Sequence, residues 1–245
     1  MRIVRNERRI NVLRSVGQYA SLAGLVILIG GLIISFVRPL WTGPLVASMS
    51  LGFLLSIIGG FYADRYAGPL ARHKTLAEVL KGLDYRHTLI QYLLPAEHVL
   101  LEPGGCTCFV VKPQGGTVTY DPDRERWEHR ERGKFFRRLV GQESLGKPHV
   151  EGEEEIGRLQ RYLNKKMDDD ADVDVDVDVP IRAVIVFINE DVEVRADEAP
   201  LPTFYRKKVK DWLRGPGALD PLPDHVQQRL AVALGVAESG DRTDD

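Results

Sequence analysis

Two long stretches near the start of the chain carry no charged residue, and they constrain the fold more than any other feature of the sequence. The first runs from Ser15 to Val37, and the second, after a lone Arg38, runs from Pro39 to Ala63. Each exceeds the roughly 20 residues that a helix needs to cross the hydrocarbon core of a bilayer. Because a charge at the bilayer centre costs about 2.5–3.5 kcal/mol on insertion scales, the pattern predicts a hairpin of two transmembrane helices over residues 15–65.

Two other interpretations of these stretches are less favourable. A buried hairpin in a soluble core needs more chain to cover it than the charge-rich remainder supplies, and a cleaved signal peptide has a shorter apolar run with no second span. The flanking charges predict the orientation, because five arginines precede the first span while the connector holds only Arg38. The positive-inside rule then places both ends, including a basic segment over residues 1–14, in the cytoplasm of a multi-pass protein of the cell (inner or plasma) membrane.

Small residues recur at every fourth position of the second apolar stretch. They are Ser48, Gly52, Ser56 and Gly60. At this spacing they share one helix face, which allows another helix to approach closely. The partner is either the first span of the same chain, which we favour, or a second copy. Neither span contains an acidic residue or a histidine, which argues against a transporter or a proton path.

The remaining residues, 66–245, are charge-rich and predict a mixed α/β domain. They hold 26 Lys+Arg and 33 Asp+Glu, a net charge of −7. Short apolar runs bounded by Gly and Pro predict strands over residues 88–94, 98–101, 107–112, 116–120, 183–188 and 192–195. Longer amphipathic runs predict helices over residues 70–83, 148–166, 204–213 and 222–236. The last helix falls in a C-terminal segment, residues 215–245, that ends in a disordered tail.

An acidic segment, residues 168–179, contains seven Asp but does not fit an EF-hand calcium site, which leaves only weak binding of calcium or another cation as an alternative to a solvated loop. An EF-hand loop that begins at Asp170 would place Val175 where glycine is needed and Ile181 where a bidentate glutamate is needed. Like charges at this density repel one another, which predicts a solvated, disordered loop. The two cysteines of the chain are too few for a four-cysteine zinc site and fit small buried residues.

The most informative motif, over residues 94–118, is LPAEHVLLEPGGCTCFVVKPQGGTV. It combines an acid–His pair before an apolar strand, a Pro-Gly-Gly turn, and a second strand that ends in lysine before a glycine. These features resemble the NERD (nuclease-related) family. Further similar segments follow in the family's order: Gly146-Lys147-Pro148 before a helix, the strand 181–189 and the helix 209–213. The resemblance covers residues 75–214 and defines a NERD-like domain over residues 70–214.

The resemblance implies both a fold and a chemistry. The fold is a restriction-endonuclease-like mixed-sheet core flanked by helices, of the PD-(D/E)xK type. Neighbouring strands of such sites bring carboxylates that hold Mg²⁺ and a lysine that stabilises developing negative charge. Glu97 matches the first acid and metal ligand, and Lys112 matches the lysine, but Val110 stands where the second acid belongs. Gln114 is a weak substitute, so the resemblance implies a degenerate site without a cofactor, unless another carboxylate lies beside Lys112.

A basic stretch follows this motif. Its arginines are Arg124, Arg126, Arg130, Arg132, Arg137 and Arg138. Because Trp127 and two phenylalanines are interleaved, the stretch could contact nucleic-acid phosphates and bases or anionic lipid headgroups. Five acidic residues between positions 121 and 131 offset the charge and favour a solvated loop instead.

Two functions remain open on these grounds. The favoured one is a membrane-anchored, non-catalytic NERD-like module that binds a protein or a nucleic acid at the inner membrane face. The alternative is an active Mg²⁺-dependent nuclease that uses Glu97 and Lys112 with an unrecognised acid, and a purely structural membrane protein is a third, weaker interpretation. The sequence contains no phosphate-binding P-loop and no Gly-x-Ser-x-Gly motif that would indicate another enzyme class.

Overall fold

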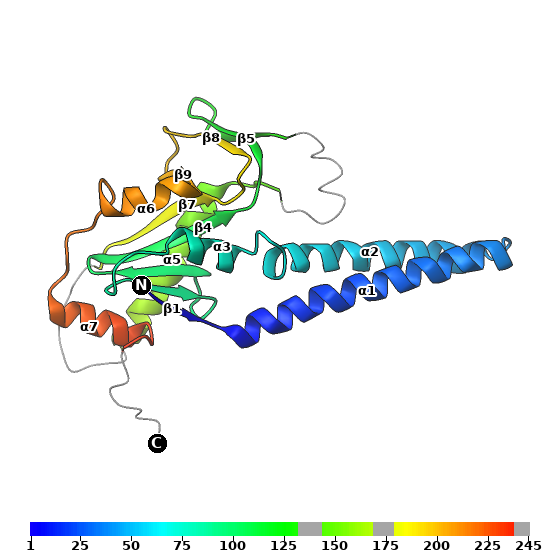
Figure 1. Ribbon diagram of the computed structural model, residues 1–245, viewed down its shortest axis with the longest axis horizontal. Coiled ribbons are helices and arrows are strands. Elements are labelled where there is room, and N and C mark those ends of the chain that lie inside the picture. Colours follow the sequence, from blue (N-terminus) through cyan, green and yellow to red (C-terminus); the bar gives the residue numbers. More distant parts are fainter. Residues whose placement is uncertain (132–143, 169–178, 238–245) are drawn as a thin grey trace, which may run out of the picture.

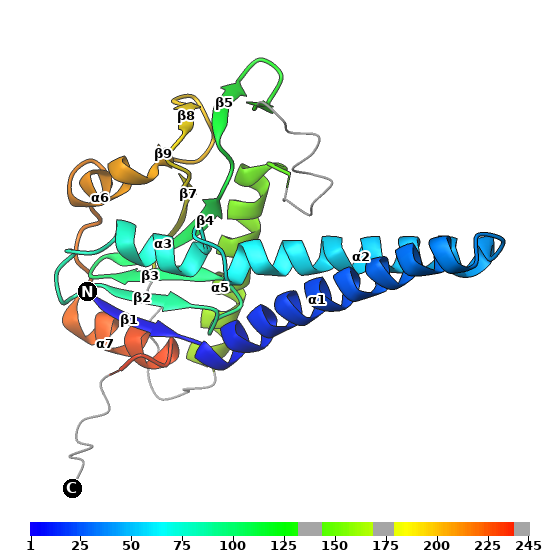
Figure 2. The same ribbon diagram turned by 45° about the vertical axis from the view of Figure 1, so that its right-hand side comes forward.

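The computed structural model describes residues 1–131, 144–168 and 179–237 of the chain (Figure 1). A long hairpin of two helices projects from a mixed α/β body, so the predicted class is confirmed (Figures 1 and 2). Three arginines of the basic stretch, Arg132, Arg137 and Arg138, lie outside the described residues. The same holds for residues 169–178 of the acidic segment and for residues 238–245 of the C-terminal tail.

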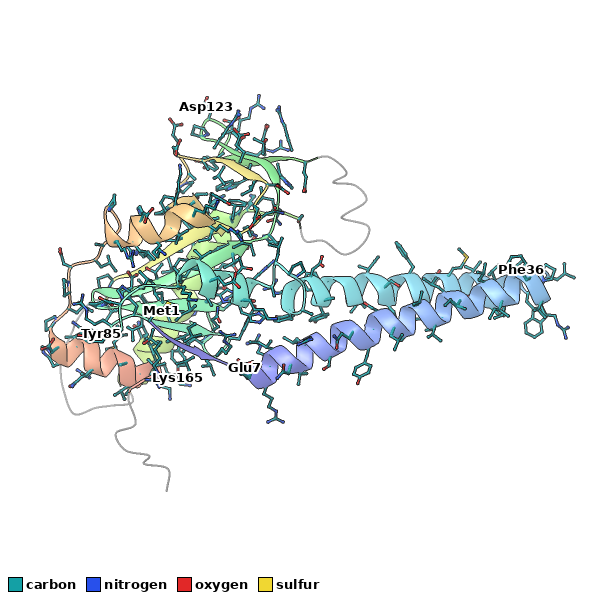
Figure 3. The ribbon with its side chains drawn as sticks, viewed as in Figure 1. Met1, Glu7, Phe36, Tyr85, Asp123 and Lys165 are labelled. Carbon is teal, nitrogen blue, oxygen red and sulfur yellow. The ribbon has the colours of Figure 1, made fainter. Side chains whose placement is uncertain are left out.

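The hairpin consists of α1 (Glu7–Val37) and α2 (Thr42–Tyr66). Both helices are long and apolar enough to cross a membrane, and their outer faces expose large apolar side chains, as at Phe36 near the tip (Figure 3). The helices touch through small residues: a Cβ added at Gly24 would lie 2.8 Å from the backbone oxygen of Gly52, and one at Gly31 would lie 3.0 Å from the Cβ of Ser48. Ser48, Gly52 and Ser56 of α2 therefore pack against α1 of the same chain, whereas the next buried glycine of α2 is Gly59 rather than the predicted Gly60.

The main sheet has six strands in the order β1-β2-β3-β4-β7-β9. They are β1 (Arg2–Arg5), β2 (Thr88–Gln91), β3 (His98–Glu102), β4 (Gly105–Lys112), β7 (Ile181–Phe187) and β9 (Thr203–Tyr205). β2, β3 and β4 form an antiparallel meander, whereas β1, β7 and β9 run parallel to their neighbours. The sheet is therefore mixed, as the sequence predicts.

The first strand lies in the segment that was expected to be a basic cytoplasmic end. β1 pairs in parallel with β2, from Arg2 opposite Thr88 to Arg5 opposite Gln91. The amino group of Met1 donates a hydrogen bond to the carbonyl of Leu83 at 2.9 Å. Because β1 is an edge strand, its charged side chains have room at the rim of the sheet. The hairpin is therefore an insertion between a strand and the rest of the same body.

Helices cover both faces of this sheet. α3 (Arg72–Val79) and α6 (Arg206–Arg214) pack on one face, and α5 (Pro148–Asp168) and α7 (Asp224–Ala233) pack on the other (Figure 2). Successive side chains of a strand point to opposite faces, so Phe109 of β4 packs toward α3 and α6, while Cys108 packs toward α5. α7 contributes Leu230 to the same core as Cys108, although it follows the predicted NERD-like domain in the sequence.

A second, three-stranded sheet has the order β6-β5-β8. Its strands are β5 (Gly116–Asp121), β6 (Arg126–Arg130) and β8 (Val192–Arg195). The prediction of a solvated loop is wrong for β6, because Trp127 is buried against Tyr120 and its indole nitrogen donates a hydrogen bond to His149 at 2.8 Å. Arg124, Arg126 and Arg130 remain exposed around this hairpin.

Candidate functional site

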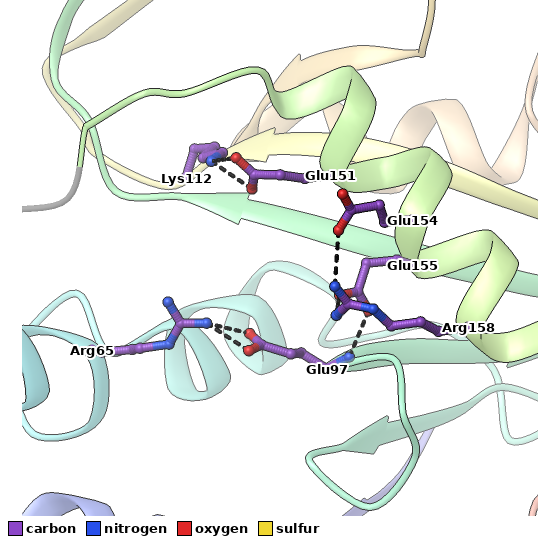
Figure 4. A network of polar contacts seen from close by, with 7 residues as sticks. All are labelled: Arg65, Glu97, Lys112, Glu151, Glu154, Glu155 and Arg158. Atoms are coloured by element: carbon purple, nitrogen blue, oxygen red, sulfur yellow. Dashed lines mark hydrogen bonds and ion pairs between the residues drawn. The ribbon is translucent and has the colours of Figure 1, made fainter.

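The candidate site lies where β4 extends past the beginning of β3. β3 pairs with β4 from Val99 opposite Cys108 onward, whereas β4 continues to pair with β7 as far as Lys112. The extra length of β4 forms one wall of a pocket of about 170 Å³. The charged lining of this pocket, which we call the root pocket, consists of Arg65, Arg72, Glu97, Glu151, Glu154, Glu155 and Arg158. The root pocket thus joins the end of α2, the start of α3, the sheet and α5 (Figure 4).

Glu97 is held by an arginine from the hairpin. One guanidinium nitrogen of Arg65, near the end of α2, lies 2.6 Å from both carboxylate oxygens of Glu97. The backbone N–H of Glu97 donates a hydrogen bond to Glu155 at 2.9 Å. Burial alone would raise the pKa of Glu97, but the charge and hydrogen bond of Arg65, together with the neighbouring His98 and Arg72, outweigh it and leave this pKa below its ordinary value. Glu97 is therefore an ionised carboxylate whose two oxygens already face a cation.

Lys112 has a carboxylate partner that the motif does not contain. Its side chain is 1% exposed, and its ammonium donates hydrogen bonds to both carboxylate oxygens of Glu151 at 2.7 Å. Glu151 belongs to the first turn of α5. The expectation that no acid lies beside Lys112 is therefore wrong, because the acid comes from a helix rather than from the strand.

A glycine explains how this helix reaches the strand. A Cβ added at Gly152 would lie 2.5 Å from the end of the Leu201 side chain and 3.1 Å from the Cβ of Ala183, so glycine allows this close approach without displacing either residue. The same built Cβ would lie 3.6 Å from the side chain of Val110. Val110 is buried among Ile185 and other apolar side chains. The first turn of α5 therefore covers the position that the second acid of the motif would occupy.

The two residues predicted to act together are paired separately. Figure 4 shows Lys112 bound to Glu151 and Glu97 bound to Arg65, at different ends of the network. On the α5 side, Arg158 contacts Glu154 at 2.9 Å and Glu155 at 3.0 Å (Figure 4). In the part of the chain that the structure describes, no three His, Cys, Asp or Glu side chains are grouped to hold a metal ion.

Neither Gln114 nor the nearby acid Glu102 compensates for Val110. Gln114 is buried beyond Pro113 and is not part of the lining of the root pocket. Glu102 lies at the opposite end of β3, where its carboxylate contacts Arg182 at 3.1 Å. The charged site residues that the motif leaves out are Arg65, Arg72, Glu151, Glu154, Glu155 and Arg158, and the sequence signal for the last four is the charge in the first turns of α5.

Buried aromatic and histidine side chains connect the root pocket to the hairpin. Tyr92 lies 4.9 Å from His98, 6.1 Å from His73 and 5.6 Å from Tyr66, measured between ring centroids. Burial lowers the pKa of His98 to about 3 and that of His73 to about 4. Tyr66, the last residue of α2, belongs to this cluster together with Ile10 of α1. Both helices of the hairpin are thus seated on the same buried group.

The chain matches no family model, no curated protein and no solved structure. What the fold and the site define is a mixed α/β protein with an inserted apolar hairpin and a charged pocket at the hairpin's root.

Proposed function

We propose that this protein is a membrane-anchored, non-catalytic binding module with a NERD-like, restriction-endonuclease-like body on the cytoplasmic side. The observation that carries the proposal is the state of Lys112. Its ammonium is 1% exposed and bound to both oxygens of Glu151, so it cannot reach a substrate phosphate without breaking an ion pair. Glu97 is likewise bound to Arg65 rather than open to a metal ion.

The strand arrangement supports the family resemblance that underlies the proposal. Glu97 directly precedes β3, Lys112 ends β4, and these two strands are neighbours in the sheet. This is the relation that the family pattern requires between its acid and its lysine. α5 then leads to β7, which pairs in parallel with β4. A body of this fold with its charged side chains paired internally is better suited to binding than to phosphodiester hydrolysis.

The hairpin supports the proposed location. Its outer faces are apolar, and arginines gather at the end that meets the body: Arg5, Arg8, Arg9, Arg14 and Arg65. By the positive-inside rule, the body and both ends of the chain lie in the cytoplasm, with the connector at Arg38 outside. Self-association through the small-residue stripe is not part of the proposal, because Ser48, Gly52 and Ser56 already face α1.

The second candidate function, a Mg²⁺-dependent nuclease, gains support from one observation. Glu151 supplies a carboxylate beside Lys112, directly above the position of Val110. If Arg65 were displaced, Glu97 and Glu151 could offer Mg²⁺ oxygen ligands from two sides of the root pocket.

A cleavage assay separates the two functions. The full chain, purified in non-ionic detergent, is incubated with labelled DNA and RNA in Mg²⁺ or Mn²⁺, beside the near-isosteric variants Glu97→Gln and Lys112→Met. We expect no cleavage above a mock preparation and no difference among the three proteins. Metal-dependent cleavage that both substitutions abolish, in folded protein, would overturn the non-catalytic proposal.

Membrane topology is tested independently of catalysis. In cells that produce the Arg38→Cys variant, a membrane-impermeant maleimide should label the connector from outside. The wild-type chain is the matched control, because its cysteines, Cys106 and Cys108, are buried in the sheet. Labelling of the connector only after the cells are lysed would contradict the proposed orientation.

A further inference from the structure

We propose that the root pocket binds a zwitterionic lipid headgroup in which a phosphodiester is joined to a primary ammonium. The inference rests on the proposed membrane anchoring and names the ligand of the binding module. It is carried by the order of charges in the pocket, by an unpartnered buried histidine and by the size of the pocket.

The charges of the root pocket are ordered along the direction away from the hairpin. Arg65 lies in the last turn of α2, two residues after the charge-free stretch ends, and Arg72 begins α3. Three glutamates of α5 line the opposite side, and Figure 4 shows Glu97 between Arg65 and the α5 residues. Arg158, on the same helix, is an exception to this order and is paired with Glu154 and Glu155. A headgroup that enters from the membrane side presents its phosphate first and its ammonium further out. This order places the phosphate against guanidinium groups and the ammonium against carboxylates.

A buried histidine lacks the partners that such a headgroup could supply. His98 lines the pocket and is 2% exposed, and neither of its ring nitrogens has a hydrogen-bond partner among the described residues. Buried polar groups in native proteins are generally hydrogen-bonded, and a neutral imidazole offers one donor and one acceptor. A phosphodiester oxygen of the headgroup can accept a hydrogen bond from the protonated ring nitrogen of His98, which gives that nitrogen a partner.

The mixture of charges selects a zwitterion over a simple ion. The pocket is lined by three arginines and four glutamates, so a lone phosphate would face the carboxylates and a lone cation would face the guanidinium groups. Burial raises the pKa of Glu155, and the neighbouring charge of Glu97 adds to this effect, so an ammonium placed here relieves repulsion between carboxylates. The existing pairs, such as Arg65 with Glu97, exchange partners with the ligand without a change in net charge.

The volume of the pocket and the hydrogen-bond donors that its carboxylates require restrict further which headgroup can bind. The pocket of about 170 Å³ is smaller than the 300–1,000 Å³ typical of sites for drug-sized ligands, which suits a compact headgroup rather than a nucleotide. A primary ammonium has three N–H donors for the carboxylates, whereas a quaternary ammonium has none. The site is therefore expected to prefer an ethanolamine headgroup to a choline headgroup of the same net charge.

Titration calorimetry on the full chain in non-ionic detergent tests the ligand. The probes are dihexanoyl phosphatidylethanolamine, the matching phosphatidylcholine and phosphatidylglycerol, and soluble phosphoethanolamine. We expect saturable binding of the ethanolamine lipid and at least about tenfold weaker binding of the other three. Equal affinities for the three lipids would overturn the proposal. Tighter or equal binding of phosphoethanolamine would also overturn it, because the ligand would then be a free metabolite.

Two pairs of variants assign the binding to this pocket. Glu155→Gln keeps an acceptor for the Glu97 backbone, so it should remain folded while it weakens ethanolamine-lipid binding at least about tenfold. Its control is Glu153→Gln, an exposed neighbour on α5. Arg72→Gln should act in the same way beside the exposed Lys74→Gln. Loss of affinity in the controls, or none in Glu155→Gln, would overturn the assignment.

The failure of this inference is distinguishable from the failure of the proposed function. The titration uses micelles and does not depend on the chain spanning a bilayer. Flotation of the wild-type chain with phosphatidylcholine vesicles tests membrane anchoring without any ethanolamine lipid. A chain that floats but shows no headgroup preference refutes the inference alone, whereas a chain that does not float refutes the anchoring on which the inference rests.

Discussion

The hairpin and the α/β body are held together in different ways. In the hairpin, glycines bring the backbones of α1 and α2 into contact, and large side chains such as Leu22 and Phe36 point outward. In the body, large apolar side chains fill both faces of the sheet, and charged groups are paired at its ends. This difference is the one expected if the hairpin lies in lipid, as proposed, because association in lipid depends on close packing, whereas folding in water depends on apolar burial.

The hairpin and the body meet at a joint whose contacts are neither glycine-mediated helix packing nor the apolar packing of the sheet. There Arg65 binds Glu97, and Tyr66 packs on Tyr92. If the comparison is correct, damage to the body should leave the hairpin associated, and damage to the hairpin should leave the body folded. The chain has a third tryptophan, Trp212 on α6, so variants that keep only Trp41 at the hairpin tip or only Trp127 in the second sheet give separate fluorescence signals for the two regions.

The largest effect of a single substitution is expected from breaking the buried pair of the body. Glu151→Gln removes the charge that neutralises the buried ammonium of Lys112 and should lower the free energy of unfolding by about 3 kcal/mol. This is the lower end of the range for a buried ion pair, because the side chain of Glu151 is 44% exposed. Urea unfolding in detergent, followed by Trp127 fluorescence, measures the loss. The exposed Glu153→Gln should change stability by less than about 0.5 kcal/mol. Equal losses in the two variants would show that the pair has no special role.

Acid should destabilise the body and spare the hairpin. His98 and His73 have lowered pKa values in the folded protein, of about 3 and about 4, so below pH 6.5 the unfolded chain binds protons that the folded chain does not. Stability should therefore fall as pH decreases, by about 2 kcal/mol per histidine between pH 7 and pH 5.

Unfolding measured at both pH values tests this dependence. His98→Asn should remove the contribution of one histidine, whereas the exposed His225→Asn should leave the dependence unchanged. A wild-type body whose stability is the same at pH 7 and pH 5 would contradict the burial of uncharged histidines at the joint.

Adding a methyl group should destabilise the hairpin at one glycine and not at another. A Cβ at Gly24 would lie 2.8 Å from the oxygen of Gly52, whereas a Cβ at Gly30 meets no atom within 4 Å. Gly24→Ala should therefore weaken the helix pair by about 1.5 kcal/mol through overpacking, and Gly30→Ala should not. Detergent-induced separation followed by Trp41 fluorescence measures the difference. A simultaneous change in the Trp127 signal would contradict the claim that the body stays folded when the hairpin is damaged.

The smallest effect is expected at the joint. The Arg65–Glu97 pair is partly exposed, with side chains 16% and 30% accessible, so Arg65→Gln should cost only about 0.5–1 kcal/mol. The more exposed pair of Arg86 and Asp84 provides the control, because Arg86→Gln should cost less. A loss at Arg65 as large as that at Glu151 would mean that the joint, rather than the sheet, determines the stability of the body.

Most of the architecture could be predicted from patterns within short stretches of sequence. The absence of charge predicts the two hairpin helices, and alternating or apolar runs bounded by Gly and Pro predict β2, β3, β4, β5, β7 and β8. β1, β6 and β9 could not be predicted in this way. β1 and β6 have charged residues on both sides and few buried positions, and β9 has only three residues, so partners elsewhere in the chain determine them as strands.

The candidate site could be predicted only in part, for a related reason. The motif indicates Glu97 and Lys112, and both lie at neighbouring ends of adjacent strands. Their partners, Arg65 and Glu151, are 32 and 39 residues distant in sequence and belong to helices. Spacing within a motif describes which side chains share a strand face, but it contains no information about the cation or anion that a distant helix brings.

The position of β1 has a practical consequence for anyone who wishes to prepare the body in water. A truncated protein that begins after the hairpin would lose the edge strand β1 together with the apolar helices. β2 would then become an exposed edge strand that can pair with other molecules. Ile10 and Tyr66 belong to the same buried cluster, so the beginning of α1 and the end of α2 lie close together. Replacing residues 12–62 by a short glycine-rich bridge would excise the apolar arm while keeping every strand in place.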